Sequence, residues 1–524
     1  MTSRADIVSL GVLLSIGAAY QLPLLFEGVG LIDEGHLANA ALRVHRGEVL
    51  YRDVYSVYPP GSFYVVAGLF DVFTPSLIVI RAFHIALTLA LATAVYGLAR
   101  RLMEAPGALL AGLLVVATGW EAILERCHYG YLYGVFPISA LWLLAVLDER
   151  EGTKRHRLGL LAVGALAGVT LAFRLVPFLA LACAVPAFLL ARGQPFRATL
   201  ERLGWIIAGG LGVLAPIAAG FALASAGAAL AEAVFWTSIE QYLGGGQFNL
   251  PFPALQFFPS EGSPTGFHRL FMNWEFYLPI LIYGVSLLDF ALTIHADRHA
   301  PRKDPRIALR IAVTAFGAIL FLRVTGRSDY YHLAPVLMPA YVLGADLLTR
   351  LGRQLSPTPR PTLAWIAVAA LMIASFLLHD VPRTMRGALD DADEVALSPG
   401  GPRIPATSPV HDLIFALRTR PDQEQTLLVL PFYPVVYFLA DRKNPTRYDW
   451  IFPGYLKTDD ERAALIRQIE DSGVETLVYA PGAIDGDPAR RMSSFEPRLD
   501  RFLRRRFVPK ERFGRFVVMR RRAR

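Results

Sequence analysis

The chain has 524 residues, of which 54% are hydrophobic and 18% charged, with a net charge of +8 and a mean hydropathy of +0.40. Soluble domains carry roughly 25% charged residues, so the composition excludes an ordinary soluble protein and predicts a polytopic α-helical membrane protein. The basic residues are spread over short segments between apolar runs, which argues against nucleic-acid binding. The two cysteines, Cys127 and Cys183, have no metal or redox spacing.

Apolar runs near the ~20 residues that a helix needs to cross a bilayer recur along the chain. The first, 7–26, has a single Arg near its start and no small-residue cleavage site before Glu27, so we expect a retained span rather than a signal peptide. We predict further spans at 77–99, 107–121, 131–147, 158–173, 175–191, 203–223, 273–293, 307–323, 333–349 and 362–378. A total of 11 spans is favoured over 12 or 13.

The segments between these spans differ in charge. With the amino terminus in the cytoplasm, the predicted cytoplasmic segments carry 17 Lys and Arg, and the outer segments before residue 380 carry 8. This asymmetry follows the positive-inside rule. It predicts a multi-pass protein of the cell (inner) membrane with its amino terminus in the cytoplasm and its C-terminal part outside it. Residues 60–73 are apolar but short, and a crossing there would break the rule, so we expect a re-entrant or interfacial helix.

The outer segments predict the domain organisation. Residues 1–379 form the predicted transmembrane domain, with a polar first loop at 27–59 that contains a helix from Asp33 to about Arg46, and a second large loop at 224–272. That second loop is rich in aromatics, Gly and Pro, which is typical of a mobile flap over a cavity. An acidic, Pro-containing linker is predicted at 380–407. Residues 408–524 have the pattern of a soluble α/β domain, with strands at 426–430 and 475–479 and an amphipathic helix at 459–472.

Acids, arginines and histidines converge on the predicted outer face. A carboxylate at the rim of a membrane is costly unless it has a function, and the pair Asp33-Glu34 directly follows the first span. We predict that Asp33 and Glu34 are catalytic, with a partly desolvated carboxylate acting as general base towards an acceptor hydroxyl. Arginines bind phosphate with two hydrogen bonds and stabilise the charge of a leaving lipid phosphate. The predicted substrate-binding residues are Arg52, Asp53, Arg81, Arg126, Arg327, Asp329 and His332.

Each of these residues also has a structural interpretation. Asp33 is a favoured type of helix N-cap, and Glu34 can serve only to tune its neighbour. Arg52-Asp53 can be a loop salt bridge of little energetic weight, and Arg327 an interfacial arginine that extends towards the headgroups. Structural roles remain open for the others too: a satisfied turn for Asp329 and His332, helix-end anchors for Arg126 and Arg174.

The reaction needs no cofactor, because a phosphate already leaves readily. A divalent metal between the two acids stays possible but is not indicated, since no cluster has firm ligand spacing.

Several short segments together resemble the GT-C membrane glycosyltransferases, which include protein O-mannosyltransferases and bacterial lipid A aminoarabinose transferases. These segments are the acidic pair, Leu50–Val54, Tyr58–Gly61, Arg81, Gly326–Pro335, Tyr437–Arg442 and Pro445–Tyr448. The resemblance implies an inverting transfer on the non-cytoplasmic face, from a polyprenyl-phosphate sugar to a lipid, glycan or protein acceptor, with Asp33 at the position of the acidic base or acceptor anchor. Many relatives carry a basic residue near the proline pair, where Gly61-Ser62 stand here. Donor-phosphate binding is therefore expected to pass to Arg327, His332 or Arg126.

Two other classes of protein remain as alternatives. A polytopic transporter or lipid flippase would use acid and arginine clusters to bind an anionic or glycolipid substrate. A sensing or scaffolding membrane protein would retain the fold around a decayed site. The polar first loop, the C-terminal α/β domain and the scarcity of ionisable residues deep in the spans favour the transferase.

Overall fold

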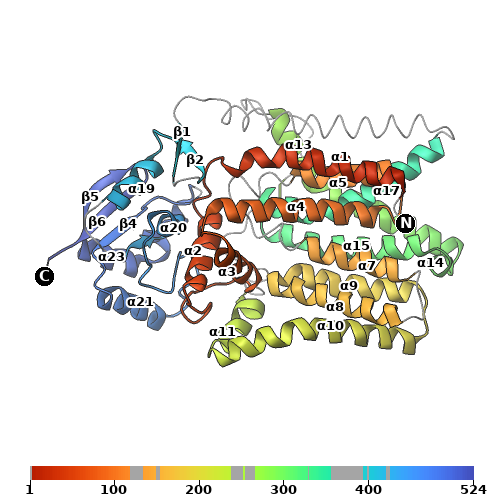
Figure 1. Cartoon of the computed structure of the whole chain (residues 1–524), viewed down its shortest axis with the longest axis horizontal. Coiled ribbons are helices and arrows are strands. Elements are labelled where there is room, and N and C mark those ends of the chain that lie inside the picture. Colours follow the sequence, from red (N-terminus) through yellow and green to blue (C-terminus); the bar gives the residue numbers. More distant parts are fainter. Residues whose placement is uncertain are drawn as a thin grey trace.

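The computed structural model describes residues 3–118, 134–148, 154–237, 252–253, 266–328, 330–355, 394–397, 401–419, 425–484 and 486–523. Long, roughly parallel helices form a bundle, and the C-terminal α/β domain covers one end of it (Figure 1). The amino terminus lies at the opposite end of the bundle.

Six helices of the described chain are long and apolar enough to cross a bilayer. They are α1 with the following turn η1 (Arg4–Gln21 and Leu22–Leu25), α4 (Leu77–Ala99), α8 (Lys154–Phe173), α10 (Phe196–Leu223), α13 (Gly266–Ala296) and α15 (Pro305–Gly326). The shorter helices α5 (Ala105–Thr118), α7 (Val135–Leu147) and α9 (Leu175–Ala191) are also apolar.

Each of the first ten predicted spans coincides with a helix, although α17 (Met338–Leu355) begins later than expected, after the short elements α16 (Tyr330–Leu333) and η4 (Ala334–Val336). The eleventh predicted span, 362–378, lies outside the described residues.

The helices α10 and α13 expose apolar side chains on the surface of the described bundle. On α10 and α13, Leu211, Leu223 and Leu288 are 57%, 89% and 59% exposed. A soluble monomer rarely exposes such continuous apolar surface. The composition, the long apolar helices and this surface together make the chain a multi-pass membrane protein.

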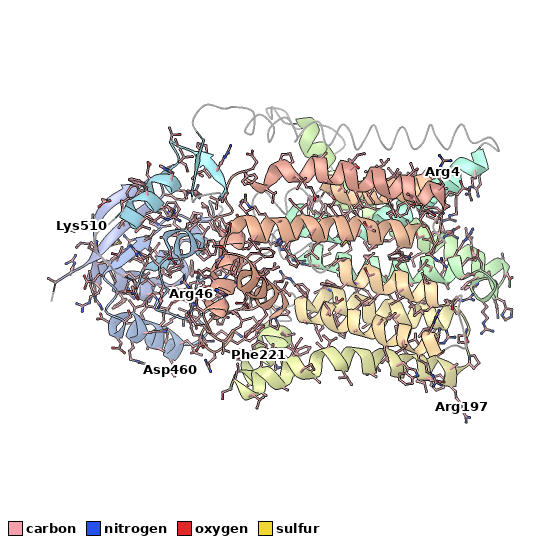
Figure 2. The ribbon with its side chains drawn as sticks, viewed as in Figure 1. Arg4, Arg46, Arg197, Phe221, Asp460 and Lys510 are labelled. Carbon is pink, nitrogen blue, oxygen red and sulfur yellow. The ribbon has the colours of Figure 1, made fainter. Side chains whose placement is uncertain are left out.

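Arginines make contacts at both ends of the bundle. At the end with the amino terminus, Arg100 donates to Asp6 at 2.6 Å and Arg192 to the carbonyl of Arg302 at 2.7 Å. Arg4 and Arg197 also lie at this end (Figure 2). At the other end, Arg81 donates to the carbonyls of the segment that follows α1.

The C-terminal domain is built on a four-stranded sheet of order β3-β4-β6-β5. The strands are β3 (Leu428–Leu430), β4 (Thr476–Tyr479), β5 (Phe507–Phe513) and β6 (Phe516–Arg521). The β3 and β4 strands are parallel, and the chain between them forms α20 (Val435–Ala440) and α21 (Asp459–Asp471); α19 (Pro409–Thr419), α22 (Met492–Phe495) and α23 (Pro497–Arg506) complete the domain. The predicted strands and the predicted amphipathic helix are confirmed; α21 starts with a capping box between Thr458 and Glu461.

The predicted linker contributes a small sheet. Strands β1 (Glu394–Ala396) and β2 (Arg403–Pro405) pair antiparallel. The β2 strand also bridges to Glu27, and the backbone N–H of Gly28 donates to the carbonyl of Arg403 at 2.9 Å. The end of the first span is therefore tied directly to the chain that leads into the C-terminal domain.

The predicted first-loop helix is confirmed as α2 (Asp33–His45), and residues 60–73 form the helix α3 (Gly61–Val72). Both lie at the boundary between the bundle and the C-terminal domain (Figure 1). Their apolar side chains share one hydrophobic core with α19, α20 and the sheet. Gly35 of α2 approaches Val435 so closely that a Cβ there would lie 2.4 Å from the Val435 backbone nitrogen.

Replacing Gly35 by Ala should therefore force α2 away from α20. Overpacking of this kind costs about 1–3 kcal/mol of the free energy of unfolding, and thermal unfolding of the purified protein in detergent measures it. The control is Gly68→Ala in α3, where no heavy atom lies within 4 Å of the added methyl group. There the higher helix propensity of Ala should give equal or greater stability, by up to about 1 kcal/mol. Equal unfolding temperatures for Gly35→Ala and the native chain would contradict the close contact.

Candidate active site

The helix α2 is buried along nearly its whole length, from Glu34 to Arg43. It packs on α3 and α4 on one side and on α20 of the C-terminal domain on the other. This position holds the side chains at the start of α2 where the membrane bundle meets the C-terminal domain.

Glu34 and Arg81 form a fully buried ion pair; both side chains are 0% exposed. Arg81 donates from Nε to Glu34 Oε1 at 2.6 Å and from Nη2 to Oε2 at 2.8 Å. Its other N–H groups reach the backbone carbonyls of Leu25, Glu27 and Gly28. The Gly30 N–H donates to Glu34 Oε2 at 2.7 Å. All five guanidinium donors are thus engaged, and the pair joins α4 to the turn before α2.

Asp33 is the first residue of α2, and the N-cap is Ile32 rather than Asp33. The Asp33 carboxylate is half-buried and lies near Tyr455 of the C-terminal domain. Its negative charge disfavours ionisation of the Tyr455 phenol. Burial raises the pKa of the Tyr455 phenol well above its ordinary value, and the nearby Tyr58, Tyr55 and Asp33 add to that rise. Asp33 therefore lies near an aromatic cluster at the boundary of the two domains.

A cavity of about 180 Å³ lies beside this cluster, between the first loop, the C-terminal domain and the start of the second large loop. Tyr55, Tyr448 and Tyr455 contribute aromatic faces, while Glu232 and Lys457 face each other at 3.9 Å. The second loop contributes α11 (Gly227–Ala231) and the π-helical η3 (Glu232–Thr237) to the wall of this cavity. The rest of the predicted flap, apart from 252–253 and the first turns of α13, lies outside the described residues.

Two arginines from the bundle reach the same boundary. The Arg174 guanidinium stacks on the Tyr58 ring, with its Cζ 4.2 Å from the ring centroid, and the residue is only 8% exposed. Gly61, which has no side chain, packs directly on Ala172 and Phe173, the residues before Arg174 at the end of α8. Arg327, at the end of α15, lies close to Arg490 of the C-terminal domain; burial lowers the pKa of Arg490, and the Arg327 charge lowers it further.

The remaining predicted site residues are placed as follows. Arg52 and Asp53 bind each other at 2.8 Å on the surface, and this pairing with Arg52 lowers the pKa of Asp53. His332 lies half-buried in α16, beyond Arg327. Arg126 and Asp329 lie outside the described residues. Within the described ranges, no group of three His, Cys, Asp or Glu side chains comes together as a candidate metal site, and both oxygens of Glu34 are occupied by Arg81.

Sequence reasoning missed the contacts that fix the far side of α2. Arg43 donates to Asp449 at 2.7 Å, and His36 stacks on Trp450 at 4.0 Å between ring centroids. Burial lowers the pKa of His36 to about 4, so its ring is neutral at pH 7 and packs as an aromatic. Arg43 and Asp449 are separated by 406 residues in sequence. The one available signal was an arginine placed among the apolar positions of a short helix.

The Glu34–Arg81 pair generates a stability prediction. Arg81→Met should leave the Glu34 carboxylate buried without its partner, which costs about 3–5 kcal/mol. Arg46→Met is the matched control, because Arg46 pairs with Asp441 at 2.7 Å on the surface and an exposed pair contributes less than about 1 kcal/mol. The unfolding temperatures of the two purified variants test this prediction. Similar small decreases in both variants would show that the buried pair does not stabilise the fold around α2.

Comparison with known proteins identifies solved structures of similar fold. No family model and no curated protein matches the sequence. ArnT from Cupriavidus metallidurans bound to undecaprenyl phosphate matches with a TM-score of 0.60 at 13% identity, over 99% of this chain and 98% of that chain. The archaeal oligosaccharyltransferase AglB from Archaeoglobus fulgidus, in complex with an inhibitory peptide and a dolichol-phosphate, matches with a TM-score of 0.53 at 13% identity, over 91% of this chain and 70% of that chain. The chain therefore shares the fold of ArnT and of the archaeal oligosaccharyltransferase AglB.

Proposed function

We propose that this protein is an integral membrane glycosyltransferase that moves a sugar from a polyprenyl-phosphate donor to an acceptor hydroxyl. The observation that carries the proposal is the placement of Asp33: a half-buried carboxylate at the mouth of a membrane bundle, beside an aromatic cavity and at the same end as Arg174 and Arg327. The fold supports it, because two proteins that share the fold bind undecaprenyl phosphate and dolichol-phosphate.

Asp33 is the proposed general base. It takes the proton of the acceptor hydroxyl as the hydroxyl oxygen attacks the anomeric carbon of the donor. The bond between that carbon and the phosphate oxygen breaks, and the polyprenyl phosphate leaves with the electron pair. Attack from the face opposite the phosphate inverts the anomeric configuration.

The leaving phosphate gains negative charge, and a fixed cation beside it stabilises the transition state more than the ground state. We assign this role to Arg174 and Arg327. Arg174 lies directly against the loop that ends in the proline pair, where Gly61 leaves no side chain to compete for the space. It therefore supplies positive charge at the place where the first loop lacks a basic residue of its own.

Glu34 and Arg81 have a different role in this proposal. Each is saturated by the other and by backbone groups, so they orient Asp33 and do not contact the substrate. With Glu34 occupied in this way, the acidic pair does not act as a pair of metal ligands, and the transfer proceeds through side chains alone.

The acceptor enters through the cavity beside Tyr455. Its aromatic walls offer flat apolar faces to a sugar ring or an aromatic group, and the pair of Glu232 and Lys457 offers polar contacts at its rim. We place this end of the molecule outside the cytoplasm, because the predicted outer segments of the described chain all lie on the side of the C-terminal domain.

Asp33→Asn tests the base. The amide keeps the size of the side chain but takes up no proton at neutral pH, so turnover should fall by roughly 10²- to 10⁴-fold while donor binding persists. The measurement incubates the purified protein with a panel of polyprenyl-phosphate sugars and follows bound and consumed donor. Asp71→Asn is the control, because Asp71 is an exposed acid of α3 that pairs with His45 at 2.7 Å on the surface. Unchanged donor consumption by Asp33→Asn would reject the assignment, and loss of transport without any donor consumption would favour a transporter.

Arg174→Met tests the phosphate contact. The methionine retains an apolar contact with Tyr58 but removes the charge, so donor affinity should weaken roughly tenfold or more, as expected for the loss of charge-assisted hydrogen bonds. Arg46→Met at the same end of the molecule controls for a general loss of positive charge. Equal donor affinity in both variants, measured by titration with the bound sugar lipid, would leave the phosphate role to other residues.

A further inference from the structure

The last 35 residues of the chain, 490–524, carry a large excess of positive charge. They contain 14 Lys and Arg but only 3 Asp and Glu, a net charge of +11, whereas the whole chain has +8. Their elements α23 and β5 lie at the end of the molecule farthest from the amino terminus (Figure 1), and Lys510 lies at the end opposite Arg4 (Figure 2). The excess charge is therefore at the tip of the C-terminal domain, away from the bundle.

One face of α23 consists of arginines. The exposed arginines of this helix, named here the α23 arginine row, are Arg498, Arg501, Arg504 and Arg505. The opposite face is buried through Leu499 and Leu503. With a rise of 1.5 Å per residue, the row is about 10 Å long.

Buried acids hold α23 in place. Glu496, directly before the helix, accepts from Arg462 Nε at 2.8 Å. Asp500 accepts from the Tyr479 hydroxyl and, at 2.8 Å, from Arg504 Nε. The backbone that carries the row is therefore fixed before a ligand binds, which lowers the entropic cost of binding.

The stability of the fold explains only part of this charge. Cations are favourable in the last turn of a helix, which accounts for Arg504 and Arg505. Charged side chains on an edge strand prevent it from pairing with another chain, which accounts for Lys510 on β5. Neither reason applies to Arg501 in the middle of α23. It lies four residues before Arg505, a spacing at which like charges on a helix repel each other.

Two arginines of the row have no acidic partner within the described chain. Arg501 donates from Nε to the carbonyl of Pro497 at 3.2 Å, and the Arg505 guanidinium makes no hydrogen bond or ion pair there. Arginine keeps its charge at any physiological pH. Both guanidinium groups are exposed, so they can bind an anion from solution.

The described acids near the end of α23 do not compensate these two arginines. Glu470 of α21 binds Arg506 at 3.1 Å and Arg521 at 2.9 Å. Asp471 and Glu475, which are exposed just after it in sequence, form no ion pair with the row.

Three further acids of this domain, Asp422, Glu424 and Asp485, lie outside the described residues. The described strand that follows the first two, β3, is the edge strand opposite β5. The residue before Asp485, Ile484, packs in the core shared with α2, whereas the buried leucines of α23 pack in the other core of the sheet.

The surroundings of the row favour a hydrophilic ligand. Among the described residues, the exposed large hydrophobic side chains end at Phe415, so none lies on α23 or on the β5–β6 hairpin. A protein partner would need an apolar patch at the centre of the interface, and a single-stranded nucleic acid would need exposed aromatic rings for stacking. A bilayer around the bundle would lie on the other side of the C-terminal domain (Figure 1).

We propose that the α23 arginine row binds a polysaccharide that carries carboxylate groups along its chain. A guanidinium binds a carboxylate with two parallel hydrogen bonds, and successive sugar units present successive carboxylates to the row. The site is separate from Asp33, which lies at the boundary with the bundle, and binding there does not depend on the proposed transfer.

The test measures binding of fluorescently labelled polygalacturonate, by anisotropy, to the full-length protein in phosphatidylcholine nanodiscs. Labelled dextran of equal length is the neutral comparison. We expect saturable binding of polygalacturonate that weakens as the salt concentration rises, and no binding of dextran. Phosphatidylglycerol vesicles and duplex DNA are added as competitors at equal charge. If either displaces the label at a lower concentration than unlabelled polygalacturonate does, the choice of a polysaccharide is wrong.

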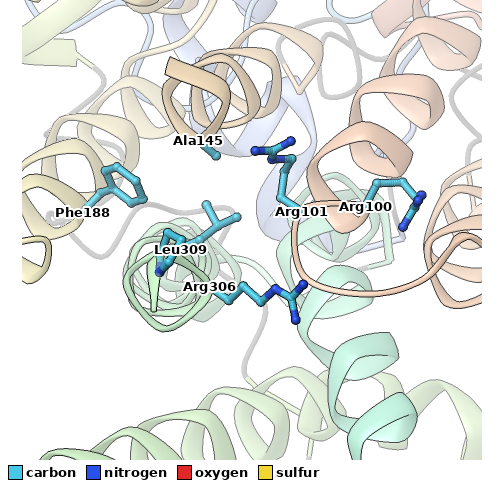
Figure 3. Close-up of a pocket in the computed structure, with 7 residues that line it drawn as sticks. Arg100, Arg101, Ala145, Phe188, Arg306 and Leu309 are labelled. Carbon is cyan, nitrogen blue, oxygen red and sulfur yellow. The ribbon is translucent and has the colours of Figure 1, made fainter. Parts of the chain in front are cut away.

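The decisive variant is the double change Arg501→Gln with Arg505→Gln. Its control is Arg197→Gln with Arg298→Gln, which removes the same charge from two exposed arginines at the other end of the molecule. That end is also rich in arginines, and three of them, Arg100, Arg101 and Arg306, line a cavity in which their side chains point in different directions (Figure 3). The control therefore measures how much a polyanion binds there through charge alone.

The double change in the row should weaken polygalacturonate on the order of tenfold, since each lost guanidinium removes charge-assisted hydrogen bonds, and the control should change it little. Because both arginines of the row are exposed, the variant should keep the unfolding temperature of the native chain. If it does not, the single variant Arg505→Gln, which loses no contact within the described chain, decides the matter. Equal losses in the row variant and the control, or no binding by the native chain, would overturn the proposal.

Discussion

The buried ion pair between Glu34 and Arg81 is the constraint on which the half of the molecule next to the C-terminal domain depends. Two charges without solvent are tolerated only when every donor and acceptor is matched, and here the guanidinium satisfies one carboxylate and three backbone carbonyls at once. The pair therefore fixes the chain after α1, the start of α2 and the wall of α4 as one unit. Asp33 is adjacent to Glu34, so this unit also fixes the backbone from which the Asp33 side chain extends.

The opposite side of α2 is fixed by the C-terminal domain. Val435 packs against Gly35, Trp450 stacks on His36, and Asp449 binds Arg43. A helix of 13 residues would be marginally stable alone in water, so it depends on both surfaces between which it lies. This arrangement gives the C-terminal domain a direct physical role: it completes the environment of the proposed base and supplies Tyr455 to the cavity beside it.

Arginines serve as structural ties at both ends of the molecule. Arg81 binds Glu34 near the C-terminal domain, and Arg100 binds Asp6 near the amino terminus. Arg174 also contacts an aromatic ring, that of Tyr58. In the proposed mechanism this ring contact holds the guanidinium where the leaving phosphate gains its charge.

The sequence alone determined the class of the protein, the order of its helices and the presence of a C-terminal α/β region, because hydropathy and period are local properties of the chain. Helices α4 and α9 occupy the predicted residues, and Asp33 opens the predicted loop helix. Only the tertiary structure decided which acid of the adjacent pair is committed to an arginine 47 residues away, and that Arg43 binds an aspartate 406 residues away. Such pairings depend on which side chains the folded chain brings within about 3 Å of each other in a water-free interior, and no local pattern records that distance.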